Sequence, residues 1–228
     1  TIAVALKYLN KDVTAYSYSF LNGLDENKYG NRIAKICDFP FHDLRIVKGY
    51  LWDKIEDLAK INGCYAEFTN PRQMAFIDKY KTMGDVFFLG HLGDHLFDSM
   101  GVDDQLSLDD QVAIILKKTV KNGGLELANR LWKEWDLEGH FEAYLHDRIL
   151  KLLREINIKN SANAAIRAFK SIYYVNRWTN TNLSVFESVN PIKLPYYDDR
   201  MCQFICSIPE KYLAGRQIQI EYIKLRNP

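Results

Sequence analysis

Hydrophobic and polar positions in the first hundred residues follow two periods. A period of two over residues 13–20, with many β-branched and aromatic side chains, predicts a strand, and residues 39–46 predict a second strand that is entered through Pro40. Apolar positions at helical spacing predict four helices, the last of them capped by Asn70, over residues 2–9, 25–37, 50–61 and 70–84. Together with an apolar run at residues 86–89, this order predicts an α/β fold with a mostly parallel sheet and helices on both faces.

The apolar run at residues 86–89 leads into a turn with polar side chains. The run is continuous, which predicts a fully buried strand, and it ends at Gly90 before the sequence His-Leu-Gly-Asp-His at residues 91–95. Because the ligand crevice of an open α/β sheet lies at the carboxyl ends of its strands, we expect functional chemistry at this turn. The alternative is a purely structural turn, in which the glycines form the bend and Asp94 caps the helix that follows.

His91 and His95 raise the question of a metal site. They are four residues apart, so a helix through both would place the two imidazoles on one face. Gly93 lies between them and no third histidine is nearby, whereas a structural zinc site usually has four ligands. Metal binding by His91, His95 and Asp94 is therefore kept as a minor alternative.

From residue 102 onwards the pattern is mainly helical. Apolar periodicity predicts helices over residues 106–121, 124–135, 137–156 and 162–175. Four aromatic residues in this part are expected in the core or between helices: Trp132, Trp135, Phe141 and Tyr144. Residues 176–190 are polar and rich in Asn, Thr and Ser, which predicts a long loop.

The last part of the chain predicts two short helical segments. Asp198 or Asp199 would cap the first, and residues 218–225 would form the second. The first would bury Met201, Phe204, Ile205 and Ile208. We therefore expect one domain over residues 1–228, with an α/β part at 1–101 and a mainly helical part at 102–228.

Composition restricts the partners and the location. The net charge of +1 gives no reason to expect nucleic acid or an anionic membrane as a partner, and no apolar run is long enough to span a bilayer. The four cysteines lack the CxxC spacing of a zinc ribbon, and Cys202 and Cys206 are expected to be small core residues at helical spacing. A reducing cytoplasm is the simplest setting for such a chain.

Three separated segments resemble one family, in the same order. Residues 86–97, Val-Phe-Phe-Leu-Gly-His-Leu-Gly-Asp-His-Leu-Phe, resemble its Ser-Gly-Glu-Gly-(Ala/Ser)-Asp-Glu-Leu-Phe, and residues 194–200, Leu-Pro-Tyr-Tyr-Asp-Asp-Arg, resemble its Arg-x-Pro-Phe-Leu-Asp. Near the start, residues 15–20, 25–26 and 41–43 are similar to its adenosine-side strand and the following His-His-Glu strand. The family is the synthetase (C-terminal) domain of asparagine synthase, within the ATP pyrophosphatase group. The resemblance covers nearly the whole chain and is weakest between Gly101 and Asn176.

The resemblance implies an adenine nucleotide alpha-hydrolase-like fold and an ATP-dependent carbon–nitrogen ligase. In such an enzyme a side-chain carboxylate, of aspartate or an analogue, is adenylated by ATP with Mg²⁺, and ammonia then displaces AMP to form an amide. The part over residues 1–101 would bind the nucleotide. Neither nucleic acid nor a membrane is implied as a partner, and the assembly is left open, with a homodimer as one option.

The resemblance also implies roles for individual residues. Tyr18 lies where family members contact adenine through backbone groups, and Leu89 and Gly90 replace the Ser-Gly pair beside the nucleotide. Asp94 keeps the acidic position expected near Mg²⁺ and pyrophosphate, so it is the candidate metal ligand. His91, Asp94 and His95 are the candidate catalytic residues.

Several positions depart from the family pattern. His91 replaces a glutamate, His95 replaces another acid, and Leu92 replaces a glycine. An imidazole can act as acid, base or hydrogen-bond donor, but it does not bind Mg²⁺ as a carboxylate does. The chain is therefore either a specialised relative that condenses another carboxylate and amine, or a degenerate, non-catalytic nucleotide-binding domain. The cationic catalytic residue stays unassigned, because Arg216, Gln217, Gln219 and Lys224 do not match its pattern clearly.

The beginning of the chain leads to a further expectation. The sequence enters an apolar helix directly after Thr1, whereas an α/β domain usually places a strand and a turn before such a helix. In the family, the phosphate loop Ser-Gly-Gly-Leu-Asp-Ser would end just before Thr1. We therefore expect this loop upstream, and ammonia from a glutaminase domain outside this chain. The chain alone is expected to be inactive.

Overall fold

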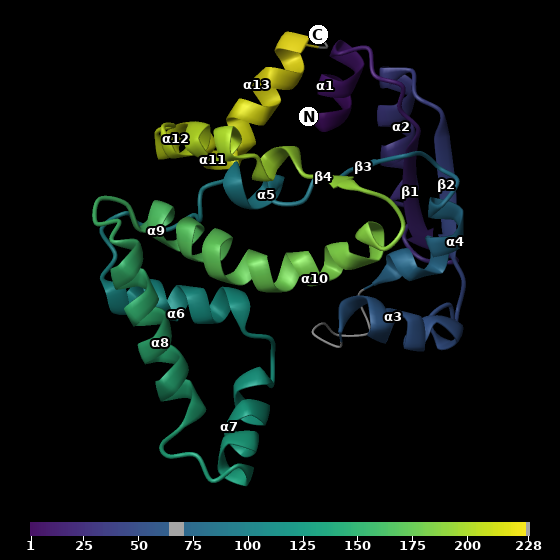
Figure 1. Ribbon diagram of the computed structural model, residues 1–228. Coiled ribbons are helices and arrows are strands. Elements are labelled where there is room, and N and C mark those ends of the chain that lie inside the picture. Colours follow the sequence, from purple (N-terminus) through teal and green to yellow (C-terminus); the bar gives the residue numbers. More distant parts are fainter. Residues whose placement is uncertain (64–70, 227–228) are drawn as a thin grey trace. The chain divides into compact units, whose positions relative to one another are not determined.

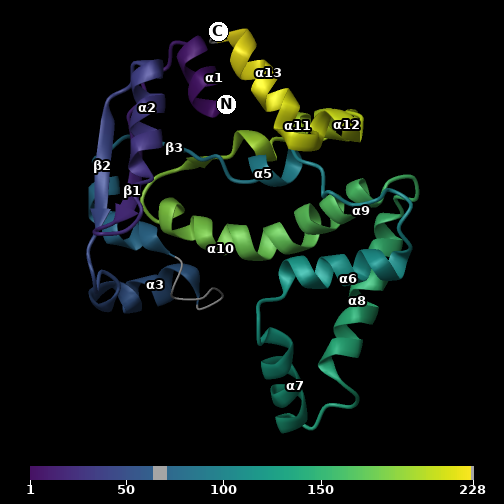
Figure 2. The ribbon, with the colours of Figure 1, turned by 180° about the vertical axis from the view of Figure 1, so that it is seen from behind.

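The computed structural model describes residues 1–63 and 71–226 (Figures 1 and 2). The chain combines many helices with short parallel strand pairs, so it belongs to the α/β class, as the sequence predicts. It divides into two compact units. The first comprises residues 1–93, 177–206 and 217–228, and the second comprises residues 94–176 and 207–216. The first unit thus contains segments from both sides of residue 101.

A parallel strand pair with its connecting helix forms one side of the first unit. Strands β1 (Ala15–Phe20) and β2 (Phe41–Ile46) pair in parallel along their full length, and helix α2 (Asn27–Cys37) connects them. This confirms both predicted strands and the predicted helix between them. Helix α2 lies alongside the pair in both views (Figures 1 and 2). Asn27 at its start is buried and donates its side-chain amide to the carbonyl of Leu44 in β2 (3.2 Å) and to the carboxylate of Asp43.

A second parallel pair is much shorter. Strand β3 (Phe87–Phe88) pairs with β4 (Ile192–Lys193), and the amide of Leu89 donates to the carbonyl of Lys193 (3.0 Å). The described strands thus form two separate two-stranded sheets. The prediction that residues 86–89 are fully buried is wrong, because Val86 and Phe88 are 40% and 45% exposed while Phe87 and Leu89 are buried. Successive side chains of a strand point to opposite faces, and one face of this strand is open.

Most of the remaining helices of the first unit lie where the sequence predicts helices, and residues 195–197 form a short helix that it does not predict. They are α1 (Ile2–Tyr8), η1 (Trp52–Lys54), α3 (Ile55–Asn62), η2 (Arg72–Phe76), α4 (Ile77–Tyr80), η4 (Pro195–Tyr197), α11 (Asp199–Cys206) and α13 (Gln217–Arg226). Asn70, the expected cap of the fourth helix, lies outside the described residues. In α11 only Ile205 is buried, and Phe204 and Cys206 are exposed, so their expected core positions are wrong.

Helix α10 (Asn176–Glu187) replaces the loop that the sequence predicts for residues 176–190. Its polar side chains bond to the helix itself, since Thr181 donates to the carbonyl of Arg177 (2.7 Å) and Asn182 to that of Trp178 (3.0 Å). Three apolar side chains of the helix are buried: Leu183, Val185 and Phe186. Phe186 stacks on Tyr80 with 5.7 Å between ring centroids, in a core shared with β2 and β3. Tertiary burial therefore overrides the polar composition.

The second unit is helical. It contains α6 (Leu108–Thr119), α7 (Gly124–Glu134), α8 (Phe141–Ile156), α9 (Ala162–Phe169), the π-helical turn η3 (Lys170–Val175), α12 (Glu210–Leu213) and η5 (Ala214–Arg216). Helices α6, α8 and α9 share a core around Ile115, Leu153 and Ile166. The ring of Trp132 lies 5.4 Å from that of Phe141 and 5.1 Å from that of Tyr144, measured between centroids, which confirms packing between α7 and α8. Trp135 is 62% exposed, so its expected packing role is wrong.

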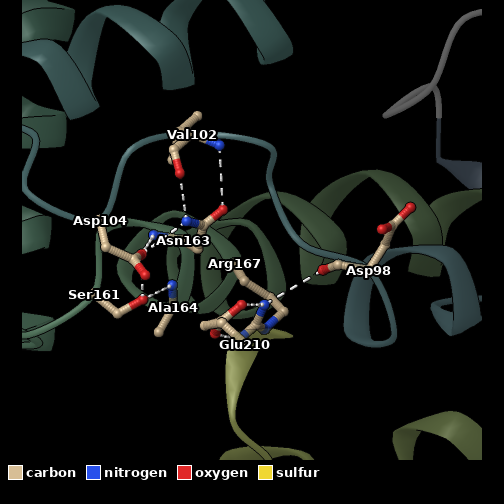
Figure 3. A network of polar contacts seen from close by, with 8 residues as sticks. All are labelled: Asp98, Val102, Asp104, Ser161, Asn163, Ala164, Arg167 and Glu210. Carbon is tan, nitrogen blue, oxygen red and sulfur yellow. Dashed lines mark hydrogen bonds and ion pairs between the residues drawn. The ribbon is translucent and has the colours of Figure 1, made fainter. Parts of the chain in front are cut away.

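A network of polar contacts fixes the segment before α6 to the start of α9 (Figure 3). Asn163 is buried, donates to the carbonyl of Val102 and to the carboxylate of Asp104 (both 2.7 Å), and accepts from the amide of Val102 (3.3 Å). Ser161 caps α9 by accepting from the amide of Ala164 and donates its hydroxyl to Asp104 (2.7 Å). These donors, first of all the side chain of Asn163, lower the pKa of Asp104 below its ordinary value.

A buried ion pair further along α9 also connects separate segments of the second unit. Arg167 pairs with the carboxylate of Glu210 through both of its terminal nitrogens and donates to the carbonyl of Asp98 (3.4 Å; Figure 3). Arg167 is 8% exposed, so this bidentate pair is largely removed from water. It joins the segment 207–216 to α9 within the second unit.

We predict that Asn163→Ala lowers the free energy of unfolding by about 2–4 kcal/mol, because the change leaves the backbone N–H and C=O of Val102 without their partner and removes one of the donors to Asp104. Urea denaturation followed by circular dichroism measures this change. Asn160→Ala is the matched control, since Asn160 is exposed and three residues earlier. Equal losses in the two variants would contradict a role for the network.

Candidate functional site

A small open pocket in the first unit brings together one predicted site residue from a strand and another from the turn after β3. It has a volume of about 240 Å³ and is lined by Tyr18, Arg72, Gln73, His91, Trp178, Thr179 and Asn182. Tyr18 comes from β1, Arg72 from η2, His91 from the turn after β3 and Trp178 from α10, so four separate parts of the sequence form one site. Its lining combines two large aromatic side chains with a guanidinium and an imidazole.

Tyr18 lies in the middle of β1, opposite Leu44 of β2. Its ring packs against Phe76, with 6.1 Å between centroids. Burial raises the pKa of the Tyr18 hydroxyl above its ordinary value, although the nearby charge of Arg72 acts against the shift. The hydroxyl is therefore protonated at neutral pH and serves the pocket as a hydrogen-bond donor or acceptor.

Arg72 supplies the positive charge of the pocket. Its guanidinium carbon lies 5.3 Å from the centroid of the Phe20 ring. Burial raises the pKa of both Tyr18 and Tyr50, and the charge of Arg72 opposes this rise. Arg72 is solvent-exposed, and among residues 1–63 and 71–226 it forms no ion pair within 4 Å. The guanidinium is thus in a position to receive an anionic ligand group.

His91 lies in the turn after β3 and is partly buried. Its ring meets that of Phe186 edge-on, with 6.4 Å between centroids, and this contact holds it beside α10. The next residue, Leu92, has a backbone φ of 75°, in the left-handed region, although its side chain is buried. Such a conformation costs about 1 kcal/mol or more for a leucine. Burial of the Leu92 side chain offsets this cost.

Leu89 and Gly90 do not line the pocket. The amide of Leu89 is bonded to β4, so it is not available to a nucleotide. Gly90 is exposed, and its carbonyl accepts from the amide of Gly93 (3.3 Å), which closes the turn.

The glycine at position 93 is required by a close approach of an aromatic ring. A Cβ atom at this position would lie 2.5 Å from Cε2 of Tyr196. Tyr196 is buried, and Gln219 of α13 donates to the carbonyl of Gly93 (3.3 Å). The turn is therefore held by packing from η4 and α13.

Asp94 and His95 belong to the second unit, whereas Tyr18 and His91 belong to the first. Helix α5 (Gly93–Leu96) begins after His91, so no single helix runs through both histidines. Asp94 is exposed at the start of α5. The side chain of His95 receives a hydrogen bond at Nδ1 from Lys170 (3.2 Å), and burial lowers its pKa.

The described residues do not support the metal-site alternative. Within residues 1–63 and 71–226, no group of three or more His, Cys, Asp and Glu side chains has the geometry to hold a metal ion. A zinc site at His91, Asp94 and His95 would need such a group.

The sequence pattern does not indicate four residues that line the pocket: Arg72, Trp178, Thr179 and Asn182. The last three lie in the segment predicted as a loop, and their helical arrangement depends on burial of Leu183, Val185 and Phe186 in the same helix. Arg72 follows a proline at a helix start, where nothing in the pattern distinguishes it from an ordinary surface charge.

Comparison with family models, with curated proteins and with solved structures finds no match to this chain. No helix among the described residues combines the length and the hydrophobicity that a membrane span requires. The function is therefore argued from the residues of the site.

We predict that Gly93→Ala destabilises the protein by about 1–3 kcal/mol, because the new methyl group overlaps the ring of Tyr196. Gly84→Ala is the matched control, since a Cβ there meets no atom within 4 Å. Thermal unfolding of the two variants measures the difference. A Gly93→Ala variant as stable as the control would show that the turn does not depend on this contact.

Proposed function

We propose that the chain is part of an ATP-dependent amide-forming enzyme of the asparagine synthase type, with an adenine nucleotide alpha-hydrolase-like nucleotide-binding part. The observation that carries the proposal is the pocket in which Tyr18 of β1 lies with Arg72, His91 and Trp178. The resemblance of residues 15–20, 86–97 and 194–200 to that family supports it from the sequence.

The chemistry of the pocket suits one portion of an adenine nucleotide. Aromatic side chains such as Tyr18 and Trp178 offer faces on which a purine can stack, and Arg72 offers a planar cation to a phosphate oxygen. The volume of about 240 Å³ is below the range of about 300–1,000 Å³ that is typical for drug-sized ligands. The pocket therefore matches the nucleoside end of the ligand rather than a whole triphosphate.

The proposed reaction has two steps. In the first, a carboxylate oxygen of the substrate attacks the α-phosphorus of ATP, and the bond from that phosphorus to the bridging oxygen breaks with loss of pyrophosphate. In the second, the nitrogen of ammonia attacks the activated carbonyl carbon, loses a proton, and AMP leaves with its oxygen. Mg²⁺, when bound, would neutralise charge on the phosphate oxygens.

The residues of this chain would contribute binding and positioning to this reaction. Asp94 can supply one carboxylate to a phosphate-bound Mg²⁺, which commonly uses one or two carboxylates and keeps several waters. His91 lines the same pocket as Tyr18 and would act there as a hydrogen-bond donor or as a proton acceptor from the attacking amine. The specific carboxylate is left open, so aspartate and a carboxylate of another acceptor both fit this step.

A non-catalytic nucleotide-binding domain is the second candidate. It is favoured by the turn after β3, where the amide of Leu89 is bonded to β4 and the ring of Tyr196 lies against Gly93. A turn held in this way offers fewer backbone donors to phosphate oxygens than a glycine loop does.

The binding experiment is a titration of the chain with AMP, because the pocket is matched to the nucleoside end. We predict that Arg72→Met weakens AMP binding about tenfold, by loss of one charge-assisted contact. Arg32→Met is the control, since Arg32 is exposed on α2 and does not line the pocket. An AMP affinity that does not differ between the two variants would exclude this pocket as the nucleotide site.

The catalytic experiment uses the full-length protein and follows exchange of labelled pyrophosphate into ATP. Exchange stimulated by aspartate supports the asparagine-forming reaction, and exchange stimulated only by another carboxylate supports the specialised relative. AMP binding without any exchange identifies the non-catalytic domain and excludes the ligase.

A further inference from the structure

A buried cation in the second unit is not accounted for by the site described above. Lys170 begins the π-helical turn η3 and is 9% exposed. It lies four residues after Ile166, on the face of α9 that packs into the core. Burial lowers the pKa of its ammonium below the ordinary value. A lysine at such a position costs stability, and π-helical turns of this kind occur often at functional sites.

The hydrogen bond from Lys170 determines the tautomer of the neighbouring His95 imidazole. An ammonium group has only donors, so Nδ1 of His95 accepts the bond of 3.2 Å and the ring proton lies on Nε2. The ammonium keeps two further N–H groups, and Nε2 of His95 adds a third donor. Two different elements, α5 and η3, supply these donors.

A second lysine adds to the positive charge. Lys118 lies in the last turn of α6, where its ammonium approaches the carbonyl of Met100 (3.5 Å), and its charge lowers the pKa of both Lys170 and His95. The negative charge of Asp94 has the opposite effect and acts to raise the pKa of both Lys170 and His95. Yet within residues 1–63 and 71–226 no ion pair as short as 4 Å involves Lys170 or Lys118. The cluster therefore carries more positive than negative charge.

We propose that Lys170, His95 and Lys118 form a binding site for a phosphate oxyanion, either inorganic phosphate or the phosphate end of a larger molecule. The ammonium of Lys170 and Nε2 of His95, joined through the bond at Nδ1, offer donors to several oxygens of a phosphate group, and the exposed ammonium of Lys118 adds positive charge nearby. The two ammonium groups exceed the carboxylate of Asp94 by one positive charge, so a phosphate monoanion would balance the excess and offset the cost of burying Lys170. The site lies within the second unit and does not rest on the proposed function.

The test is a calorimetric titration of the whole chain with inorganic phosphate and with pyrophosphate at low ionic strength. We expect Lys118→Ala to weaken binding about tenfold and Lys170→Met to abolish it, with the affinity of the unmodified chain falling as NaCl is added. Lys117→Ala is the matched control, because Lys117 is the preceding, exposed residue of α6 and does not act on either Lys170 or His95 in the described contacts.

The stability of the Lys170→Met variant separates a binding role from a structural one. Methionine replaces a buried cation by an apolar side chain of similar length, so we expect a midpoint of thermal unfolding that is unchanged or higher. Loss of phosphate binding together with retained stability supports the site. Absence of binding to the unmodified chain, or equal weakening by Lys117→Ala and Lys118→Ala, overturns it. No nucleotide turnover is measured, so failure of the ligase reaction and failure of this site are distinguishable.

Discussion

The ring of Tyr196 against the backbone of Gly93 is the contact on which the turn after β3 depends. It leaves no room for a Cβ atom, and it brings a residue late in the chain next to the turn that carries His91. The neighbouring β3–β4 pair adds the hydrogen bond from Leu89 to Lys193. Residues 87–93 are therefore positioned by residues about a hundred positions later, and the place of His91 follows from this pairing.

Helix α10 connects this turn to the pocket. Phe186 of α10 packs on Tyr80 and on the ring of His91, and Asn182 and Trp178, one and two turns earlier along the same side of the helix, line the pocket. One short helix thus serves both the core of the first unit and the candidate nucleotide site. A change in the packing of Phe186 would shift the position of the His91 ring, since the two rings are in contact.

The second unit shows a contrast between two buried cations. Arg167 is paired with the carboxylate of Glu210, so its charge is compensated within the protein. Lys170, one helical turn further along, has a neutral imidazole as its hydrogen-bond partner and a second lysine nearby. The first arrangement fixes the structure, whereas the second leaves charge that an external anion can balance.

The sequence by itself determined the local elements whose apolar period is strong: β1, α2, β2 and the helices α6 to α9 all lie where the pattern predicts them. It also indicated Tyr18 and His91, which the structure brings into one pocket, whereas Leu89 and Gly90 lie outside it. Only the tertiary structure decided that residues 176–187 are helical and that β4 pairs with β3, because both depend on burial against distant residues rather than on local propensity. The same reason applies to Arg72 and Lys170, whose surroundings are formed by segments far away in the sequence.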